Sequence, residues 1–387
     1  MNDKIGILTG GGDVPGLNPV IKSVVYGGSE IRRPVVGIRR GWAGLTYMTS
    51  ADDPDYIREL TRDNTRTIER SGGTILHTSR TNPRKVAEAK LPKHLPKDQL
   101  KKLPFDGKTY DLTSIVLSNL EKLGIGCLVA IGGDDTLSFA SVLSAAGFPV
   151  VAIPKTMDND VQGTEYCIGF STAVTRAKQS ITRQRTTVGS HERIGIFRIF
   201  GRDAGFTSLY TAYVTSTRCL IPEHPFELDR VCGLMMEDKA NNPSNYALIV
   251  VSEGAMWTQG KVAEFGEADA YGHRKKVDIG AALAEEIQKR TGQETMVSDL
   301  TYDLRSGEPD SIDMIVATTF ANIAVELIRE GVSGRMIGVQ NGCYIHTSLP
   351  DLSKGARTVD IAKLYNTDRY RPNYHSKLGA PLFFSGS

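Results

Sequence analysis

Residues 128–160 read LVAIGGDDTLSFASVLSAAGFPVVAIPKTMDND, and this stretch decides the fold. It contains an apolar run at 128–131, a Gly-rich turn, a helical pattern over 137–146 and a second apolar run at 150–153. An apolar strand followed by a helix and a second apolar strand forms a βαβ unit, in which both strands end at the same edge of a parallel sheet. In open parallel sheets, ligands bind at that edge.

The turns that follow these two strands carry charged residues. Asp134 and Asp135 follow the first strand, and Lys155, Asp158 and Asp160 follow the second. Four carboxylates and one lysine at a single edge suit a metal ion and a polyphosphate. Residues 158 and 160 are two positions apart, so an extended loop would place both side chains on one side.

Strand and helix patterns alternate along the rest of the chain, which predicts an α/β fold with parallel sheets. Residues 4–9 form an apolar run that ends in Gly10-Gly11-Gly12-Asp13, and a helix is expected from about residue 18. Glycines between a strand and a helix let backbone N–H groups approach an anion. No G-x-x-x-x-G-K-[ST] motif occurs, so the chain is not a P-loop ATPase.

Composition limits the other possibilities. With 387 residues, of which 40% are apolar, the chain is expected to form two lobes. A net charge of +2 predicts no strong attraction to nucleic acid or to a membrane. The five cysteines are odd in number and scattered, which indicates reduced thiols in a cytoplasmic protein. No apolar stretch is expected to span a bilayer, and residues 84–108 are expected to form a Lys- and Pro-rich surface insertion.

Five motifs together resemble the phosphofructokinase family. They are TGGGDVPGLN at 9–18, GGDDT at 132–136, PKTMDND at 154–160, GRDAG at 201–205 and SEG at 252–254. Each motif alone is weak, but they follow the family order over roughly residues 4–345. The resemblance implies two lobes, each a mainly parallel sheet flanked by helices. It also implies Mg²⁺ as cofactor and phosphorylation of fructose 6-phosphate at its 1-hydroxyl.

The resemblance divides the chain into a donor lobe, a sugar lobe and a remainder. Residues 1–169 and 304–345 would bind pyrophosphate and Mg²⁺, and residues 170–303 would bind the sugar phosphate. Residues 346–387 form a C-terminal extension that the resemblance assigns to neither lobe.

The resemblance also implies roles for individual residues. Asp158 matches the general base that removes the proton of the sugar's 1-hydroxyl, and Asp134 matches the magnesium-associated aspartate, with Asp160 beside it. The catalytic group would comprise Asp158, Lys155, Thr156 and Arg202. Pyrophosphate would contact Gly11, Gly12, Arg80, Asp135 and Lys155. The sugar phosphate would contact Thr156, Met157, Asp158, Arg193, Phe200, Gly201, Arg202, Glu253, Tyr302 and Arg305.

Some of these positions bear on assembly and on the substrate. Arg193 matches an arginine that reaches the neighbouring subunit's sugar site, which implies a homodimer or homotetramer. Tyr302 stands where the family often has histidine, Phe200 replaces a usual methionine, and Met296 follows a Glu-Thr pair where a second arginine is common. These departures leave a larger ketose phosphate open as the substrate.

Two residues bear on the phosphoryl donor. ATP-using members usually carry glycine where this chain has Asp135, and often where it has Lys155. A carboxylate about 4 Å from the nucleotide's α-phosphate would repel it by about 4 kcal/mol at an effective dielectric constant of about 20. Because Asp135 with Lys155 is the family's pyrophosphate pattern, the resemblance implies pyrophosphate, with ATP as the alternative donor.

Two other classes of protein share some of these features. NAD kinases and lipid kinases share the GGD turn, but that kinship does not explain PKTMDND at 154–160 or GRDAG at 201–205. A non-enzymatic binding module would lack the base or the metal residue, and Asp158 and Asp134 are both present.

Overall fold

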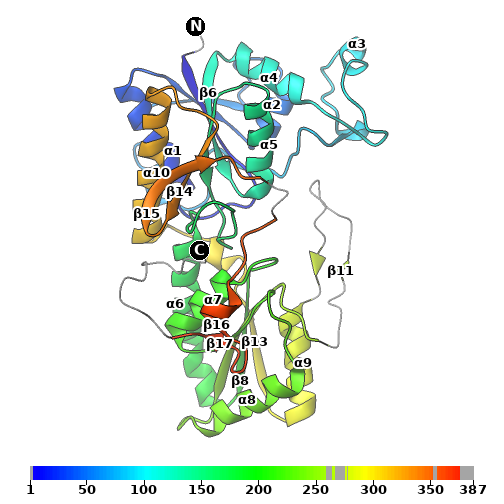
Figure 1. The fold of residues 1–387 in the computed structure, drawn as a ribbon, viewed down its shortest axis with the longest axis vertical. Helices are drawn as coiled ribbons and strands as arrows, with labels where there is room; N and C mark the ends of the chain where they lie inside the picture. Colours follow the sequence, from blue (N-terminus) through cyan, green and yellow to red (C-terminus); the bar gives the residue numbers. More distant parts are fainter. Residues whose placement is uncertain (1–2, 259–263, 266–274, 277, 352–354, 375–387) are drawn as a thin grey trace.

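The computed structural model describes residues 3–258, 264–265, 275–276, 278–351 and 355–374. Two β-sheets, each flanked by helices, lie one beyond the other along the long axis of the molecule (Figure 1). The predicted α/β architecture with two mainly parallel sheets is therefore confirmed. Residues 352–354 and 375–387 of the predicted C-terminal extension lie outside the described residues.

The first sheet has seven strands, of which the central five are parallel. Its order is β15 (Cys343–Ser348), β14 (Arg335–Gln340), β7 (Val150–Pro154), β6 (Ile125–Gly132), β1 (Lys4–Thr9), β2 (Val35–Ile38) and β3 (Ile57–Leu60). The edge strands β15 and β3 pair antiparallel to their neighbours. Thr9 pairs with Ile131 and Gly132 with Pro154, so β1, β6 and β7 end side by side.

Alternate residues of these strands pack on opposite faces of the first sheet, as the two-residue period of a strand requires. Ile7, Val129 and Ile153 share a hydrophobic cluster with α1 (Leu17–Glu30) and α10 (Ser311–Arg329). Leu8, Ala130 and Val150 belong to a second cluster. That cluster includes side chains of α2 (Trp42–Tyr47), α4 (Thr113–Lys122) and α5 (Asp134–Ala145).

The second sheet is parallel throughout its four strands. Its order is β13 (Thr295–Asp299), β8 (Ile194–Ile199), β10 (Ala247–Ser252) and β9 (Arg218–Leu220). The helices of this half are α6 (Phe170–Ser190), α7 (Phe206–Thr215), α8 (Leu228–Ala240) and α9 (Ile279–Thr291). One hydrophobic cluster contains residues of both sheets, such as Ile7 and Ile196, so the two halves share a continuous core.

Shorter elements connect these layers. They are η1 (Ile68–Arg70), β4 (Val86–Ala87), η2 (Glu88–Lys90), α3 (Lys97–Leu100), β5 (Thr109–Tyr110), β11 (Glu264–Phe265), β12 (Lys275–Lys276) and η3 (Asp303–Arg305). The segment around α3 projects from the first half, as predicted for a surface insertion (Figure 1). Val86, Leu103, Leu112 and Ile115 form a small hydrophobic cluster of their own at its base.

The helix of the central βαβ unit begins earlier than predicted. It starts at Asp134 instead of residue 137, so Asp134 and Asp135 lie in its first turn. Carboxylates are favoured there because the N-terminal end of a helix carries a partial positive charge. The two strands of the unit were predicted correctly.

One helix in the described part of the chain has the length and composition of a membrane-spanning segment. Residues 311–329, the helix α10, are long and apolar enough by length and composition to cross a membrane, so the prediction that no stretch qualifies is wrong. Half of that stretch is buried inside the protein, and α10 packs against α1, as a core helix does.

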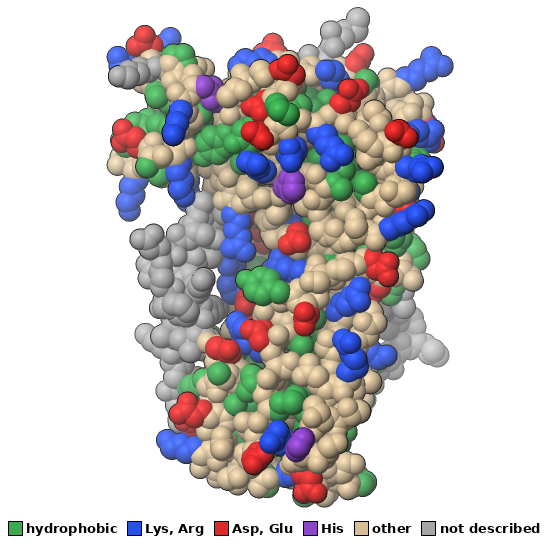
Figure 2. Space-filling view, turned by 180° about the vertical axis from the view of Figure 1, so that it is seen from behind, with side chains coloured by type: hydrophobic (Ala, Val, Ile, Leu, Met, Phe, Trp, Pro, Cys, Tyr) green, Lys and Arg blue, Asp and Glu red, His purple; other side chains and the backbone are tan. Residues whose placement is uncertain are grey.

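The five cysteines are free thiols, and four of them are buried. Basic and acidic side chains are interspersed over the face seen in Figure 2.

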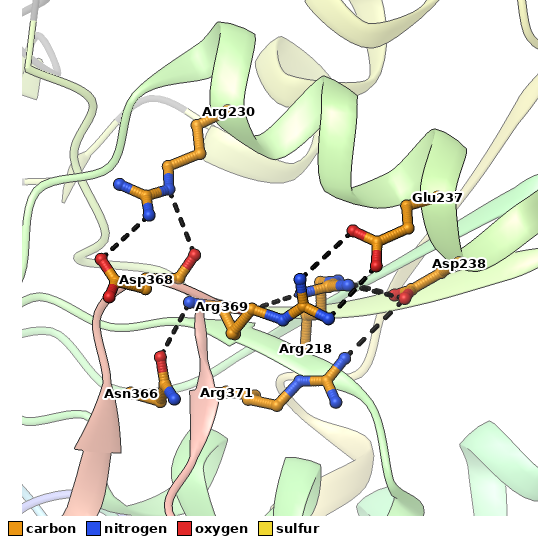
Figure 3. A network of polar contacts seen from close by, with 8 residues as sticks. All are labelled: Arg218, Arg230, Glu237, Asp238, Asn366, Asp368, Arg369 and Arg371. Carbon is orange, nitrogen blue, oxygen red and sulfur yellow. Dashed lines mark hydrogen bonds and ion pairs between the residues drawn. The ribbon is translucent and has the colours of Figure 1, made fainter.

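The C-terminal segment crosses to the second half and is fastened there. It contains α11 (Ile361–Leu364), β16 (Tyr365–Asn366) and β17 (Arg371–Pro372), and β17 packs on α7 and β9. Arg218, only 1% exposed, donates two hydrogen bonds of 2.6 Å to Asp238 and one of 2.5 Å to the carbonyl of Arg369 (Figure 3). Ion pairs of Arg230 with Asp368 and of Arg369 with Glu237 tie the same segment to α8 (Figure 3).

Candidate active site

A cavity of about 450 Å³ lies between the two halves, at the carboxyl ends of β1, β6, β7, β8 and β10. Of the predicted site residues, those lining it are Gly11, Gly12, Arg80, Asp134, Asp135, Lys155, Thr156, Met157, Asp158, Phe200, Arg202, Glu253 and Arg305. A neighbouring cavity of about 470 Å³ shares Gly12, Arg80, Phe200 and Arg305 and adds Tyr302. Two parallel sheets thus present their carboxyl edges to one another, which is where such sheets bind ligands.

Two glycines permit the close approaches that shape the cavity. A Cβ on Gly10 would lie 2.4 Å from the hydroxyl oxygen of Thr136, so the turn after β1 packs directly on the start of α5. Gly201 has a φ of 130°, which favours glycine, and its carbonyl accepts a hydrogen bond of 3.0 Å from the N–H of Gly254. Gly201 therefore shapes the turn that carries Arg202.

Lys155 brings a cation into the cavity. Its side chain is 3% exposed, and its Nζ donates a hydrogen bond of 2.5 Å to the carbonyl oxygen of Gly12. Burial and the nearby charge of Arg305 lower the pKa of Lys155 to about 7, while Asp13 acts in the opposite direction. A phosphate group would favour the charged form of this amine.

Asp158 is an enclosed carboxylate with one oxygen that has no hydrogen-bond partner among the described residues. That oxygen, Oδ1, is shielded from solvent. Burial, and then repulsion by Asp160 and Glu253, raise the pKa of Asp158 to about 8; Arg305 and Arg202 oppose the shift. An elevated pKa of this kind is typical of a general base.

Asp134 lies in a cluster of negative charge. Burial, followed by repulsion from Asp160, Asp135 and Asp203, raises its pKa to about 7. No group of three or more His, Cys, Asp or Glu side chains in the described part of the chain is arranged to hold a metal ion. Mg²⁺ commonly binds one or two carboxylates and keeps several waters, so a crowded Asp134 beside Asp160 fits this ion.

The acidic turn after β7 is not extended as the sequence predicted. Asn159 has a φ of 56°, in the left-handed region, so simple two-residue alternation does not apply between 158 and 160. Both carboxylates nevertheless line the cavity. The side chain of Asn159 stabilises the turn: its Nδ2 donates to the carbonyl of Glu165 at 2.9 Å, and its Oδ1 accepts from the N–H of Cys167 at 2.7 Å.

The second half contributes a group of cationic and aromatic side chains. Arg305 lies over the ring of Phe200, 4.4 Å from its centroid, and donates to the carbonyl of Asp13 at 3.3 Å. The ring of Phe200 also meets Tyr302 edge to face at 6.1 Å. Tyr302 is 78% exposed, so its hydroxyl is accessible to a ligand.

Two predicted site residues, Arg193 and Gly201, line neither cavity; Gly201 shapes the turn that carries Arg202, but Arg193 lies far from it. Arg193 precedes β8, whereas Phe200 and Arg202 follow that strand, so they lie at opposite ends of it. Arg193 donates to Glu294 at 2.8 Å and lines neither cavity.

The cavity also includes residues that sequence reasoning did not select. Asp203 pairs with Arg202 at 2.8 Å, and it lies inside the GRDAG motif, so the motif itself was a usable signal. Gly355 and Ala356 of the C-terminal extension line the cavity as well. No pattern in the sequence pointed to these two.

Similarity to known proteins covers almost the whole chain. Residues 4–328 match the family description Phosphofructokinase. A pyrophosphate–fructose 6-phosphate 1-phosphotransferase of Amycolatopsis methanolica is 35% identical over 359 residues, covering 92% of this chain and 96% of the relative. The same-named protein of Thermoproteus tenax is 36% identical over 372 residues, with coverage of 94% and 98%. An ATP-dependent 6-phosphofructokinase 3 of Streptomyces coelicolor is 34% identical over 367 residues, with coverage of 93% and 97%.

Solved structures support the fold. A pyrophosphate-dependent phosphofructokinase from Nitrosospira multiformis matches with a TM-score of 0.75 at 15% identity, over 96% of this chain and 89% of that chain. A phosphofructokinase structure from Saccharomyces cerevisiae matches with a TM-score of 0.72 at 20% identity, over 90% of this chain and 44% of that chain. At these identities the likeness concerns the fold alone.

Proposed function

This chain belongs to the phosphofructokinase family, and we propose that it is a pyrophosphate-dependent member. The reaction transfers a phosphoryl group from pyrophosphate to the 1-hydroxyl of fructose 6-phosphate, giving fructose 1,6-bisphosphate and phosphate. It runs in both directions and serves glycolysis or gluconeogenesis. The observation that carries this proposal is that Asp134, Asp135, Lys155, Asp158 and Arg202 line one cavity.

Asp158 acts as the general base. Its Oδ1 has no hydrogen-bond partner among the described residues, so it is available to accept a hydrogen bond from the sugar's 1-hydroxyl. As that hydroxyl oxygen attacks phosphorus, its proton passes to Asp158 and the bond to the leaving phosphate breaks. A pKa of about 8 makes this carboxylate a stronger base than an exposed aspartate.

Lys155 and Arg202 stabilise the transferring phosphoryl group from two sides of the cavity. Lys155 follows β7 of the first sheet and Arg202 follows β8 of the second. Loose phosphoryl transfer requires chiefly positioning and positive charge, which these side chains supply. Thr156 accepts a hydrogen bond of 3.2 Å from the N–H of Asp158, which orients the base. On the donor side, Gly11, Gly12 and Arg80 would contact pyrophosphate together with Lys155.

Asp135 supports pyrophosphate over ATP. It lines the cavity of about 450 Å³ and also a separate cavity of about 1040 Å³ beside the segment at 82–111. A nucleotide with its phosphate groups in the first cavity and its nucleoside in the second would lie beside the Asp135 carboxylate, which would repel the phosphate groups. ATP remains the alternative donor, because the larger cavity has room for a nucleoside and ATP-dependent relatives reach 34% identity.

Mg²⁺ is the cofactor that we propose, with Asp134 as its protein ligand and Asp160 beside it. Burial, followed by repulsion from Asp160, Asp135 and Asp203, raises the pKa of Asp134, and a bound divalent cation would relieve that repulsion, which supports this assignment. When bound, Mg²⁺ would neutralise charge on pyrophosphate.

The sugar phosphate is held mainly by the second half. The residues that we assign to it are Thr156, Met157, Asp158, Phe200, Gly201, Arg202, Glu253, Tyr302 and Arg305, with Arg193 contributed by a neighbouring subunit. The position of Arg193 at the far end of β8 supports a contribution in trans. The enzyme would then be a homodimer or a homotetramer.

The remaining assignments concern lobes and location. We assign residues 1–169 and 304–345 to a donor lobe and residues 170–303 to a sugar lobe. Five free cysteines are typical of a reducing compartment, which supports a cytoplasmic enzyme.

A donor panel tests the proposal. Purified enzyme is given fructose 6-phosphate with Mg²⁺ and pyrophosphate, ATP or polyphosphate, and fructose 1,6-bisphosphate is measured. Turnover with pyrophosphate at the highest kcat/KM is expected. Preference for ATP would favour the alternative. In a parallel assay with NAD⁺ in place of the sugar phosphate, formation of NADP⁺ without any turnover of fructose 6-phosphate would reject both.

A further inference from the structure

The C-terminal extension passes directly beside the acidic turn that carries Asp158. Gly355 and Ala356 line the cavity, and the backbone N–H of Arg357 donates a hydrogen bond of 2.7 Å to the carbonyl of Asp160. The first residues of the extension, 346–348, belong to β15 of the first sheet, and β17 further along packs on α7 and β9 of the second half. The extension therefore connects the site with both halves of the molecule.

The backbone of the acidic turn is held by contacts from outside the turn. Asn159 adopts a left-handed conformation, which asparagine tolerates better than most residues, and its side chain bonds to Glu165 and Cys167 while its carbonyl is bonded by a distant residue. Asn159 separates Asp158 from Asp160 and so sets the relative direction of the two carboxylates. Any contact that holds the Asn159 backbone therefore acts on the geometry of the base.

Three carbonyl groups of the turn accept hydrogen bonds from distant parts of the chain. Thr207 of α7 donates its hydroxyl to Met157 at 2.7 Å. The guanidinium of Arg357 donates to Asn159 at 3.0 Å, and the Arg357 N–H donates to Asp160. One residue of the extension thus supplies two of these three bonds.

The guanidinium of Arg357 joins the turn to its surroundings. It lies over the ring of Phe206, 4.2 Å from the centroid, and reaches the carbonyl of Glu165 at 3.4 Å. Phe206 is fully buried and begins α7, directly after the GRDAG motif. Burial lowers the pKa of Arg357, and the negative charges around it, Asp160 among them, act in the opposite direction.

The backbone of the extension is itself anchored near Arg357. The N–H of Val359 donates to Glu223 Oε1 at 2.8 Å, and the same oxygen accepts from the N–H of Gly205 at 2.9 Å. Further along, Arg218 of β9 donates a hydrogen bond of 2.5 Å to the backbone carbonyl of Arg369, which fastens the extension independently of the Arg369 side chain (Figure 3). Arg357 is therefore held at a fixed place relative to the GRDAG turn that carries Arg202.

We propose that Arg357 is a positioning residue for the proposed phosphoryl transfer: it holds the backbone at 159–160 so that Asp158 and Asp160 face the reacting groups. This inference rests on the proposed function for its reaction but not for its donor. Asp158 accepts the proton of the sugar's 1-hydroxyl in the transition state. A displaced Asp158 carboxylate should therefore lower kcat more than it raises KM. A displacement near 1 Å is sufficient for a loss of about 10²-fold.

The test compares three variants under one assay. Arg357→Met removes the guanidinium and its charge and keeps an unbranched apolar side chain; Arg357→Lys keeps the charge. Arg369→Met is the matched control, because Arg369 belongs to the same extension but pairs with Glu237 of α8. Arg357→Met should lower kcat at least about tenfold with KM values within about threefold. Arg357→Lys should recover part of the loss, and Arg369→Met should keep kcat within about twofold.

Two further readouts separate positioning from a merely structural role. Millimolar guanidinium chloride should restore part of the activity of Arg357→Met, whereas urea at the same concentration should not. Circular dichroism and thermal unfolding establish that each variant is folded. An unchanged kcat in Arg357→Met, or an equal loss in Arg369→Met, overturns the proposal. If Arg357→Met does not fold, Arg357→Lys decides alone: lysine is one atom shorter than the reach to the terminal guanidinium nitrogen and lacks the planar group over Phe206, so a wild-type kcat rejects the role.

The failure of this inference is distinguishable from failure of the proposed function. The assay uses whichever donor the wild-type enzyme turns over fastest, pyrophosphate or ATP, with fructose 6-phosphate. If pyrophosphate is not the donor, the wild-type enzyme itself shows this by preferring ATP. If Arg357 does not position the turn, the kcat of Arg357→Met equals that of the wild-type enzyme with either donor.

Discussion

The ammonium nitrogen of Lys155 donates a hydrogen bond to the carbonyl oxygen of Gly12, 2.5 Å away, and so joins the loop after β7 to the turn after β1. The two residues are 143 positions apart in the chain. The contact places a buried cation in the cavity that also holds Asp134 and Asp158. A phosphate oxygen of the donor would replace the Gly12 carbonyl as partner of this amine.

Binding of pyrophosphate should weaken as pH rises through the pKa of Lys155. That pKa is about 7, below its usual value of 10.5, so the charged form is present below about pH 7 and is lost above it. Titration calorimetry with pyrophosphate at a series of pH values should show this dependence. The Lys155→Met variant should bind pyrophosphate more weakly than wild type, and its affinity should no longer fall as pH rises through about 7. Retention of the same profile in the variant would contradict the assignment.

Asp158→Asn should abolish turnover and leave binding of fructose 6-phosphate within a few-fold. The amide has nearly the same shape but cannot accept the hydroxyl proton, so kcat should fall at least about 10²-fold. Steady-state kinetics and equilibrium sugar binding measure the two effects. An Asp158→Asn enzyme with more than about a tenth of wild-type activity would reject the base assignment.

The same substitution should stabilise the metal-free protein. The pKa of Asp158 is about 8 when folded and 3.8 in its ordinary state, so the folded form holds the proton more tightly. The contribution of this group to stability is therefore greatest at low pH and falls as pH rises toward 8. The Tm of Asp158→Asn should exceed that of wild type, and the difference should grow between about pH 5 and about pH 8. A constant or negative difference would contradict the shifted pKa.

Arg193 should act in the site of a neighbouring subunit. Arg193→Ala should raise KM for fructose 6-phosphate about tenfold, since loss of one charge-assisted hydrogen bond costs about 1.4 kcal/mol or more. Mixed oligomers of Arg193→Ala and Asp158→Asn subunits should contain sites with the wild-type KM, because one site then has both an intact base and an intact arginine. If the mixture shows only the raised KM of Arg193→Ala after exchange of subunits, Arg193 does not act in trans.

The sheet and the strand-end motifs could be predicted from local pattern. Apolar runs such as 128–131 and 150–153 identify buried strands, and polar residues directly after them must lie at one sheet edge. The pattern therefore predicts Asp134 and Asp158 at the same sheet edge, and both line the cavity. The start of α5 was missed because the Asp134-Asp135 pair fits both a loop and a helix N-terminus.

Long-range contacts and backbone detail could not be read from the sequence. Arg357 contacts Asn159, which lies 198 positions earlier in the chain. The sequence of the C-terminal extension has no hydrophobic periodicity from which such a contact could be predicted. The left-handed conformation of Asn159 is imposed by its bonds to Glu165 and Cys167, which only the folded chain brings together. Tertiary contacts decide such features, and local propensity does not.

The central claim is that pyrophosphate is the donor and that Asp135 excludes ATP. Asp135 lines both the phosphate cavity and the larger cavity beside it, so Asp135→Gly removes charge and volume from the path of a nucleotide. The carboxylate of Asp135 lines the same cavity as Lys155 and Arg202 and helps to orient these cations, so the variant should use pyrophosphate less well. Lys155 is unchanged in this variant and keeps its cation in the cavity.

The most direct measurement is kcat/KM for pyrophosphate and for ATP in the wild-type enzyme and in Asp135→Gly. Wild type should prefer pyrophosphate, and the variant should gain at least about tenfold with ATP, equivalent to about 1.4 kcal/mol, while losing efficiency with pyrophosphate. A wild-type enzyme that prefers ATP, or a variant in which use of ATP stays undetectable, would contradict the account.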